Sequence, residues 1–357
     1  MNNHYYCVIM AGGLGTRFWP ISRSSKPKQF LNFAKTGKSF LQLAYERVAG
    51  IIPPENILVV SQERYRDLVL ADIPDLPEAN LLLEPYNRNT ASCIAYANYT
   101  ILKRDPEGVV LVTPSDQVVG EHEDYRRTVS RGLDYAAAHD VLLTLGVVPR
   151  RPDPNFGYIQ IDSPMTDGSP VPVKTFTEKP SVELARVFLD SGEFLWNAGI
   201  FIWKASVIAG EMEEYVPEVT RQWSGWQDFV GTPDERSFLE RIYPDMPRTS
   251  IDYAVMEKSD RVMAMPAGFD WNDIGNWDSL YEYFSEGDNS VKVNGKSLLE
   301  DNSGTLVFSP SADRLVAVKG LKDYVVVDID NVLMICPRDE VKDFVSELSL
   351  PEYEKYK

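Results

Sequence analysis

Apolar, β-branched segments alternate with amphipathic segments through about the first 150 residues, and this alternation restricts the fold more than any other feature. Tyr5–Met10 is typical of a buried strand, whereas Thr90–Arg104 carries apolar residues at helical spacing. Strands that alternate with helices predict a parallel α/β sheet with right-handed crossovers. The predicted strands are Tyr5–Met10, Asn56–Val60, Asn80–Leu83, Val109–Thr113 and Val141–Gly146, and the predicted helices include Ser39–Gly50 and Thr90–Arg104.

In the second half of the chain, the pattern of predicted strands and helices changes near residue 290. Before that point we expect the strands Val171–Thr177 and Gly199–Trp203 and the helix Val182–Ser191. After it come short β-rich runs broken by turn residues, and then a helix from about Asp339 to Leu348. We therefore predict a main domain over 1–288 and a small all-β domain over 289–357, packed directly on the main domain because no low-complexity linker intervenes. The β-rich runs are Gly304–Ser309, Leu315–Lys319, Tyr324–Ile329 and Val332–Cys336.

The composition excludes several classes of protein. The chain has 357 residues, with 36 Lys and Arg against 53 Asp and Glu, so its net charge is −17. That charge argues against nucleic acid and anionic membranes as partners. No apolar run is long enough to span a bilayer, and the N-terminus lacks the features of a secretion signal, so we expect a cytoplasmic protein. The three cysteines are isolated, which argues against disulfides and a zinc site.

The positive charge gathers at the N-terminus. Residues 1–45 contain no Asp or Glu, and the first acidic residue is Glu46. Such a run is usually a solvated basic face, but here it interleaves with glycines, which favours a local site for a polyanion. The six basic residues are Arg17, Arg23, Lys26, Lys28, Lys35 and Lys38.

A glycine-rich loop follows the first predicted strand and reads Gly12-Gly13-x-Gly15-Thr16-Arg17. Glycines allow close approach and positive φ, so the bare N–H groups of such a loop can surround phosphate oxygens. The spacing fits neither the P-loop of ATPases nor the dinucleotide-binding fingerprint. Taken alone, the loop would be read as an ordinary tight turn between a strand and a helix.

The loop belongs to a longer segment, AGGLGTRFWPISRSSKPKQF, which resembles the signature of the sugar-1-phosphate nucleotidyltransferases. The closest similarity is to members that transfer a guanylyl group to mannose 1-phosphate. Further matches follow in family order along nearly the whole chain, although Gln117 stands where many members have His. The matching segments are EPxxRNTA from Glu84, Pro114-Ser115-Asp116, Glu178-Lys179-Pro180, Trp196-Asn197-Ala198-Gly199, Ser250-Ile251-Asp252-Tyr253 and Trp271-Asn272-Asp273-Ile274-Gly275.

This resemblance implies a Rossmann-like mixed, mostly parallel sheet over 1–288, as the nucleotidyltransferase catalytic domain. It also implies a small C-terminal domain like a left-handed β-helix, which helps to form a homodimer. The implied reaction joins GTP and mannose 1-phosphate to give GDP-mannose and pyrophosphate. The implied nucleotide-binding residues are Ala11, Gly12, Gly13, Gly15, Thr16, Glu84, Asn89 and Thr90, and the implied sugar-binding residues are Gly157, Glu178 and Asn197.

The chemistry of nucleotidyl transfer assigns roles to the charged residues. A sugar-phosphate oxygen is already ionised at pH 7, so catalysis reduces to positioning and charge neutralisation without a general base. We expect Arg17 and Lys28 to bind the triphosphate and Lys179 to bind the sugar phosphate. Mg²⁺ prefers oxygen ligands, and Asp116 and Asp273 are the expected pair.

The sequence leaves alternatives open. An isolated Asp is more often a turn or cap residue than a ligand, Asn89 and Thr90 could cap the helix that follows them, and Glu178 could cap the helix near Ser181. Another nucleotide, or a heptose or fucose 1-phosphate, could replace the expected substrates. A non-catalytic regulatory homologue is disfavoured because the charged residues of the motifs are all present.

Overall fold

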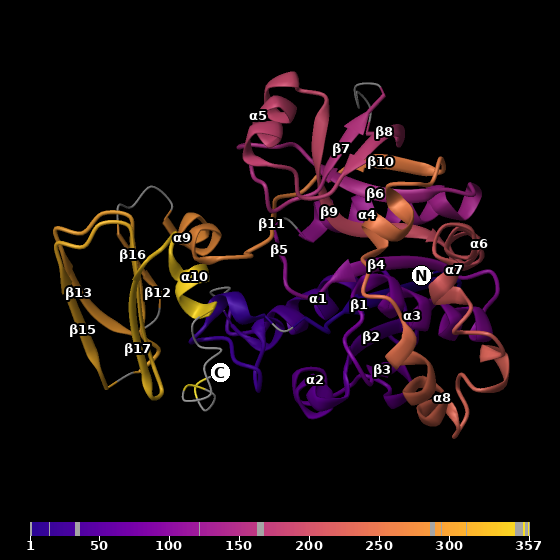
Figure 1. The fold of residues 1–357 in the computed structure, drawn as a ribbon, viewed down its shortest axis with the longest axis horizontal. Coiled ribbons are helices and arrows are strands. Elements are labelled where there is room, and N and C mark those ends of the chain that lie inside the picture. The colour runs from indigo at the N-terminus through magenta and orange to yellow at the C-terminus, as the bar shows by residue number, and fades with distance from the viewer. Residues whose placement is uncertain are drawn as a thin grey trace. The chain divides into compact units, whose positions relative to one another are not determined.

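Among the residues that it describes, the computed structural model contains a mixed sheet of nine strands (Figure 1). Seven of these strands were predicted from the sequence, and β7 (Tyr158–Ile161) and β10 (Val262–Pro266) were not. The structure describes residues 2–13, 15–32, 36–120, 122–162, 168–285, 290–293, 295–311, 313–346, 353 and 356. The chain divides into two compact units. We call them the sheet unit (Met1–Gly12, Leu41–Ser115 and Val119–Trp271) and the second unit (Gly13–Phe40, Asp116–Val118 and Asn272–Lys357).

The strands of the sheet unit follow the order β3-β2-β1-β4-β9-β6-β10-β8-β7, from β3 low in Figure 1 to β7 and β8 near its top. Among the described strands of this sheet, β8 and β9 run against the other seven. The sheet is therefore mixed and mostly parallel, as expected. Its strands are β1 (Tyr5–Met10), β2 (Ile57–Gln62), β3 (Leu81–Glu84), β4 (Val109–Pro114), β6 (Leu142–Val147), β7 (Tyr158–Ile161), β8 (Val171–Thr177), β9 (Phe194–Lys204) and β10 (Val262–Pro266).

Helices cover this sheet. Helix α3 contacts β1, β2 and β3, while α4 contacts β4, β6 and β9. A core of buried residues runs from Tyr6 and Val8 through α3 to Trp203 and Trp223. The helices of the sheet unit are α1 (Phe40–Ala49, whose first residue belongs to the second unit), α2 (Arg66–Asp72), α3 (Thr90–Arg104), α4 (His122–Ala138), α5 (Val182–Ser191), α6 (Ala205–Tyr215), α7 (Pro217–Thr220) and α8 (Glu235–Ile242).

Local sequence explains where two of these helices begin and end. Asn89 precedes α3 with φ of 71°, which Asn tolerates better than most residues, and its Oδ1 accepts the N–H of Thr90 at 2.8 Å. The hydroxyl of Ser181 accepts the N–H of Leu184 at the start of α5, and Gly192 ends that helix in the left-handed conformation. Asn89 therefore does cap α3, whereas Ser181 rather than Glu178 caps α5.

The C-terminal part of the second unit alternates between two sheets. The chain visits β12, β14 and β16 in one sheet and β13 and β15 in the other, each time in parallel register. This alternation winds the chain as in a β-helix, and β17 closes the first sheet in antiparallel fashion. The hand of the winding stays a prediction. The strands are β12 (Ser290–Val293), β13 (Lys296–Glu300), β14 (Thr305–Phe308), β15 (Leu315–Lys319), β16 (Tyr324–Ile329) and β17 (Val332–Pro337), and the helices are α9 (Trp277–Ser285) and α10 (Val341–Ser346).

The β-helix strands share a hydrophobic core with the segment that follows the first strand. Phe18, Trp19 and Ile21 pack in one buried cluster with Phe308 and Val325. The unit boundary passes through the short strands β5 (Val118–Val119) and β11 (Trp271–Asn272). Residues 13–40 therefore belong to the second unit, although they follow β1 closely in the sequence. The domain boundary at residue 288 stays a prediction.

The remaining helices are short. They are the 3₁₀ segments Thr16–Phe18, Lys28–Phe30, Pro54–Asn56, Glu63–Tyr65, Glu78–Asn80, Trp226–Asp228 and Tyr243–Asp245, and the π-helix Asp252–Met256. Within the described residues, the structure contains no helix long and apolar enough to cross a membrane. The last predicted residues of the terminal helix, up to Leu348, and Lys35 of the basic run lie outside the described part of the chain.

Candidate active site

The second unit brings together a lysine and the two carboxylates expected to bind metal. The ammonium of Lys28 lies 3.0 Å from Asp116 Oδ2 and 3.6 Å from Asp273 Oδ1. Strand β4 ends at Pro114, so Asp116 follows the carboxyl end of a strand, as predicted. Arg17 reaches the same place, because its Nη1 lies 3.8 Å from the position that a Cβ on Gly275 would take. Four residues from three distant segments therefore meet in one charged cluster.

Lys28 is buried, with 4% of its surface exposed. A buried ammonium is costly unless it is paired. Here the two carboxylates neutralise it, and its Nζ also lies 5.3 Å from the centre of the Phe40 ring and 5.9 Å from that of Phe18. The sequence predicted Lys28 as a ligand of the triphosphate, and it did not predict this contact with the acidic pair.

The carboxyl of Asp273 is held in a partly desolvated place. Burial raises its pKa above the ordinary value, and Asp116 adds to the rise, while the charges of Lys28 and Arg17 oppose it. Downstream of Asp273, the Asn276 side chain caps α9 by accepting the N–H of Ser279 at 2.8 Å, and Ser279 accepts the N–H of Gly275. The start of α9 therefore fixes the loop that carries Asp273.

The donor set fits a hard divalent cation. Two carboxylates converge on one point, and carboxylate oxygens are the ligands that Mg²⁺ takes alongside substrate phosphates. Among the described residues, no group of three or more His, Cys, Asp or Glu could hold a metal by itself. A cation at this pair would therefore need oxygens from a bound phosphate as well.

The glycine loop keeps its carbonyl groups engaged with side chains. The carbonyl of Gly12 accepts from Gln62 Nε2 at 2.6 Å, and that of Gly13 accepts from Gln29 Nε2 at 3.0 Å. In the described part of the chain, the N–H groups of Gly12 and Gly13 have no partner. N–H groups held in this way are suited to an anion.

Two further residues of the loop take defined backbone positions. The carbonyl of Ala11 accepts the hydroxyl of Ser61 at 3.0 Å. Gly15 has φ of 59°, and a Cβ there would lie 2.4 Å from the backbone nitrogen of Lys28, so only glycine fits. Thr16 begins the 3₁₀ helix Thr16–Phe18, and its side chain lies outside the described part of the structure.

The EPxxRNTA segment lies against the first half of the loop in the sheet unit. A Cβ on Gly12 would lie 3.4 Å from Oε2 of Glu84. The Glu84 carboxyl is buried, its Oε1 accepts the hydroxyl of Tyr243 at 3.1 Å, and burial raises its pKa to about 8. Arg88 donates to the carbonyls of Tyr243 and Pro244, which ties the segment to the 3₁₀ helix Tyr243–Asp245.

The expected sugar-binding residues also meet within the sheet unit. The N–H of Asn197 donates to the carbonyl of Gly157 at 2.8 Å, and a Cβ on Gly157 would lie 2.4 Å from Glu178 Oε2. Lys179 pairs with Glu178 at 2.7 Å and has a φ of 47°, unusual for a residue with a side chain. Glu178 Oε2 therefore occupies the space that a side chain at position 157 would need, next to Asn197.

Asp252 and Thr144 join this group, although no role was predicted for either residue from the sequence. Asp252 accepts from Asn197 Nδ2 at 2.9 Å, and Thr144 donates to Asn197 Oδ1 at 3.1 Å. Asp252 lies in the matched segment Ser250–Tyr253, which was a signal for its importance. Thr144 lies inside a buried strand, and nothing in the local pattern distinguishes it from a core residue.

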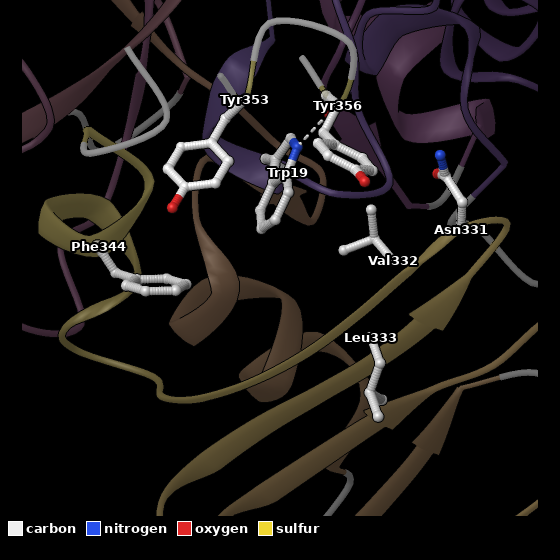
Figure 2. Close-up of a pocket in the computed structure, with 7 residues that line it drawn as sticks. All are labelled: Trp19, Asn331, Val332, Leu333, Phe344, Tyr353 and Tyr356. Atoms are coloured by element: carbon white, nitrogen blue, oxygen red, sulfur yellow. Dashed lines mark hydrogen bonds between the residues drawn. The ribbon is translucent and has the colours of Figure 1, made fainter. Parts of the chain in front are cut away.

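A pocket of about 370 Å³ in the second unit lies beside Trp19 and contains none of the predicted site residues. Figure 2 shows the Trp19 indole between Tyr353 and Tyr356, with its Nε1 donating to the carbonyl of Tyr356 at 2.7 Å. The other lining residues are Asn331, Val332, Leu333 and Phe344. The charged cluster, not this aromatic pocket, carries the groups needed for chemistry on phosphates.

Comparison with known proteins agrees with this organisation. Residues 6–289 match the nucleotidyl transferase family, and residues 301–348 match the MannoseP isomerase/GMP-like beta-helix domain. The mannose-1-phosphate guanylyltransferase of Escherichia coli K12 is 32% identical over 351 residues, which are 95% of this chain and 71% of that protein. The mannose-1-phosphate guanylyltransferase ManC of Salmonella typhimurium LT2 is 33% identical over 348 residues, 95% of this chain and 71% of that protein.

A solved structure agrees as well. The Thermus thermophilus protein described as a mannose-1-phosphate geranyltransferase superposes with a TM-score of 0.87 at 30% identity, covering 97% of this chain and 100% of that one. The matched family is that of nucleotidyl transfer enzymes, whose members generally use a divalent metal. The chain belongs to this nucleotidyl transferase family and, within it, to the mannose-1-phosphate guanylyltransferases.

Proposed function

We propose that this enzyme transfers GMP from GTP to α-D-mannose 1-phosphate, giving GDP-mannose and pyrophosphate, with Mg²⁺ as its metal. The observation that carries the proposal is the convergence of Lys28 and Arg17 with Asp116 and Asp273, in a chain whose relatives are named for guanylyl transfer to mannose 1-phosphate. The cluster has the charges that two reacting phosphates require.

In this proposal the nucleotide is bound by the glycine loop and the EPxxRNTA segment. The N–H groups of Gly12 and Gly13 bind phosphate oxygens, with Ala11, Gly15 and Thr16 shaping the loop. Glu84 receives hydrogen bonds from the N–H edge of guanine, and its position 3.4 Å from a Cβ on Gly12 supports this role. Asn89 and Thr90 hold the segment: the hydroxyl of Thr90 accepts the N–H of Ile251 at 2.9 Å.

In this proposal the charged cluster stabilises the negative charge that develops on the reacting phosphates. Arg17 and Lys28 bind the triphosphate, and Asp116 and Asp273 would hold Mg²⁺, which when bound supplies positive charge at the phosphates. Lys28 pairs with both carboxylates and so reduces the repulsion between them.

The acceptor is bound by residues of the sheet unit. Lys179 pairs with the phosphate of mannose 1-phosphate, while Glu178 and Asn197 bind hydroxyl groups beside Gly157. The phosphate oxygen attacks the α-phosphate of GTP in line with the departing pyrophosphate. Because that oxygen is already ionised, no side chain has to remove a proton.

The test is a matrix of substrates. The protein is incubated with Mg²⁺ and each pair of nucleoside triphosphate and sugar 1-phosphate, including mannose, fucose and heptose phosphates, and pyrophosphate release is followed. We expect GTP with mannose 1-phosphate to give the highest kcat/KM, because a wrong base leaves buried groups unpaired. Equal rates with UTP would remove the guanine assignment, and no release with any pair would remove the function.

We also propose a homodimer. Its support is a set of exposed aliphatic side chains on the β-helix strands, among them Leu298 and Leu315 on β13 and β15 and Leu333 and Ile335 on β17. Exposed apolar side chains of this kind favour association. Light scattering after gel filtration tests it, with a mass near twice 40.4 kDa as the expected result.

A further inference from the structure

The amide of Asn197 is bound on both sides by the protein. Its Oδ1 accepts the hydroxyl of Thr144 at 3.1 Å and the N–H of Gly199 at 3.0 Å. Its Nδ2 donates to Oδ1 of Asp252 at 2.9 Å. The three partners come from β6, from β9 itself and from the π-helix Asp252–Met256, so three separate elements hold one side chain.

These partners permit only one orientation of the amide. A backbone N–H can only donate, so Gly199 requires the oxygen of Asn197 on its side. An amide offers two acceptor positions and two N–H donors, and three of these four are used. Within the described residues, the second N–H of Asn197 Nδ2 has no partner.

The unused donor lies close to a carboxylate. A Cβ on Gly157 would lie 3.6 Å from Asn197 Nδ2 and 2.4 Å from Glu178 Oε2, so the absence of a side chain at Gly157 gives the carboxylate room beside the amide. The amide donor and the carboxylate acceptor therefore lie within about 6 Å of each other. A hydroxyl group both accepts and donates a hydrogen bond, so it matches the pair.

Asp252 has the surroundings of a functional residue. It begins a π-helix, a rare element that occurs often at functional sites. Burial raises its pKa to about 7, with the Glu178 charge adding to the rise and Lys179 and Asn197 opposing it. Whether neutral or ionised, the carboxyl keeps an oxygen that accepts from Asn197.

We propose that Thr144 and Asp252 are positioning residues that hold Asn197 so that its second N–H meets a hydroxyl of the acceptor sugar. The inference rests on the proposed function, because it assigns the sugar to this group of residues. It makes the site selective for sugars that carry a hydroxyl there, since a deoxy sugar leaves the second N–H of Asn197 and the Oε2 atom of Glu178 without that hydroxyl partner.

The test compares Thr144→Val, Asp252→Ala and Asp252→Asn with the unchanged full-length protein. Thr144→Val keeps the shape and removes the donor, so the KM for mannose 1-phosphate should rise about tenfold, equivalent to ~1.4 kcal/mol. The KM for GTP and kcat should stay within about twofold. Asp252→Ala should show the same pattern, and Asp252→Asn, which keeps an accepting oxygen, should restore most of the affinity.

Thr100→Val is the matched control. Thr100 is also buried, and its hydroxyl donates to the carbonyl of Tyr96 within α3, away from the proposed sugar residues. It should leave both KM values unchanged. Thermal melts of all variants separate loss of fold from loss of positioning.

Deoxymannose 1-phosphates provide the second measurement. One deoxy analogue should lose much of its kcat/KM with the unchanged protein but little more with Thr144→Val, because the same contact is already weakened. The inference is overturned if Thr144→Val and Asp252→Ala, both folded, leave the KM for mannose 1-phosphate unchanged or raise both KM values equally. Absence of turnover in the unchanged protein would instead remove the proposed function.

Discussion

Lys28 illustrates how a residue's surroundings can change the role read from its sequence. Placed among basic residues and glycines, it reads as a phosphate ligand, yet its ammonium is buried between Asp116 and Asp273. Local sequence cannot show this contact, because it joins segments 88 positions apart. The residue types at the site were predictable from the motifs, whereas their pairing depends on the tertiary fold.

The acidic pair leads to the first prediction. Asp116→Asn and Asp273→Asn each remove one charge, so kcat should fall by roughly 10²–10³, as when one electrostatic contact to the transition state is lost. Each single variant leaves Lys28 with one carboxylate, so its melting temperature should stay close to that of the unchanged protein. Steady-state kinetics over a Mg²⁺ titration measure kcat, and thermal melts measure the stability of each variant.

The double variant separates catalysis from stability. It should be little slower than either single variant, because the two residues act as one unit. It should also melt at a lower temperature, because a buried ammonium is left without a counter-charge. Near-normal turnover of Asp273→Asn at millimolar Mg²⁺ would show that its loop is structural.

Glu84 leads to a prediction about pH. Its pKa is about 8 in the folded chain against an ordinary value of 4.5, so the folded state keeps a proton that the unfolded chain loses. The stability that the protonated Glu84 contributes to the folded state is fully present below about pH 4.5 and is lost as the pH rises towards 8. Glu84→Gln should therefore gain stability relative to the unchanged protein over that range, by a few kcal/mol at pH 9.

Urea unfolding of the ligand-free protein at pH 5, 7 and 9 tests this. The difference in the free energy of unfolding between Glu84→Gln and the unchanged protein should grow with pH and then level off. A difference that stays constant from pH 5 to 9 would mean that Glu84 ionises normally.

At the level of elements, local pattern predicted where segments begin and end better than how they pair. Helix α3 and strand β16 have the predicted bounds. Strand β9 was expected from Gly199, yet it starts at Phe194 and runs antiparallel to its neighbours β4 and β6. Alternating apolar residues indicate a strand, but its direction depends on contacts with distant strands.

The turn at Gly15 provides a prediction about one element. With φ of 59° and Lys28 only 2.4 Å from a Cβ, Gly15→Ala cannot keep this backbone and should displace Lys28. We expect a lower melting temperature and a fall in kcat/KM of more than about tenfold, since small displacements of catalytic groups are costly.

Gly210→Ala is the matched glycine variant. Gly210 is exposed in α6, and a Cβ there has no atom within 4 Å. Alanine should stabilise the helix by roughly 0.5–1 kcal/mol and leave kcat/KM unchanged. If Gly15→Ala and Gly210→Ala have similar melting temperatures and similar kcat/KM values, the positive φ at Gly15 is not needed for activity.

At the scale of the whole molecule, the β-helix strands and residues 13–40 depend on one core. Phe18, Trp19 and Ile21 are buried together with Phe308 and Val325. The second unit therefore contains both the charged cluster and the strands that bury its supporting residues. The predicted boundary at residue 288 follows a change in the pattern of short β-rich segments, and such a pattern does not show which residues share a core.

A chain ending at residue 288 tests this dependence. It lacks Phe308 and Val325, so Phe18 and Trp19 lose their cover; a large apolar side chain contributes about 1.5–3 kcal/mol when fully buried. The segment with Arg17 and Lys28 should lose its fixed geometry, and Mg²⁺-dependent pyrophosphate release should fall to background. The sheet unit ends at Trp271, so the shortened chain keeps all of it, and a cooperative melt from that unit should persist. Lys322→Ser in the full chain is the control: Lys322 is exposed between β15 and β16, so turnover and the melt should not change. Undiminished turnover of the shortened chain would show that residues 13–40 keep their structure without the β-helix strands.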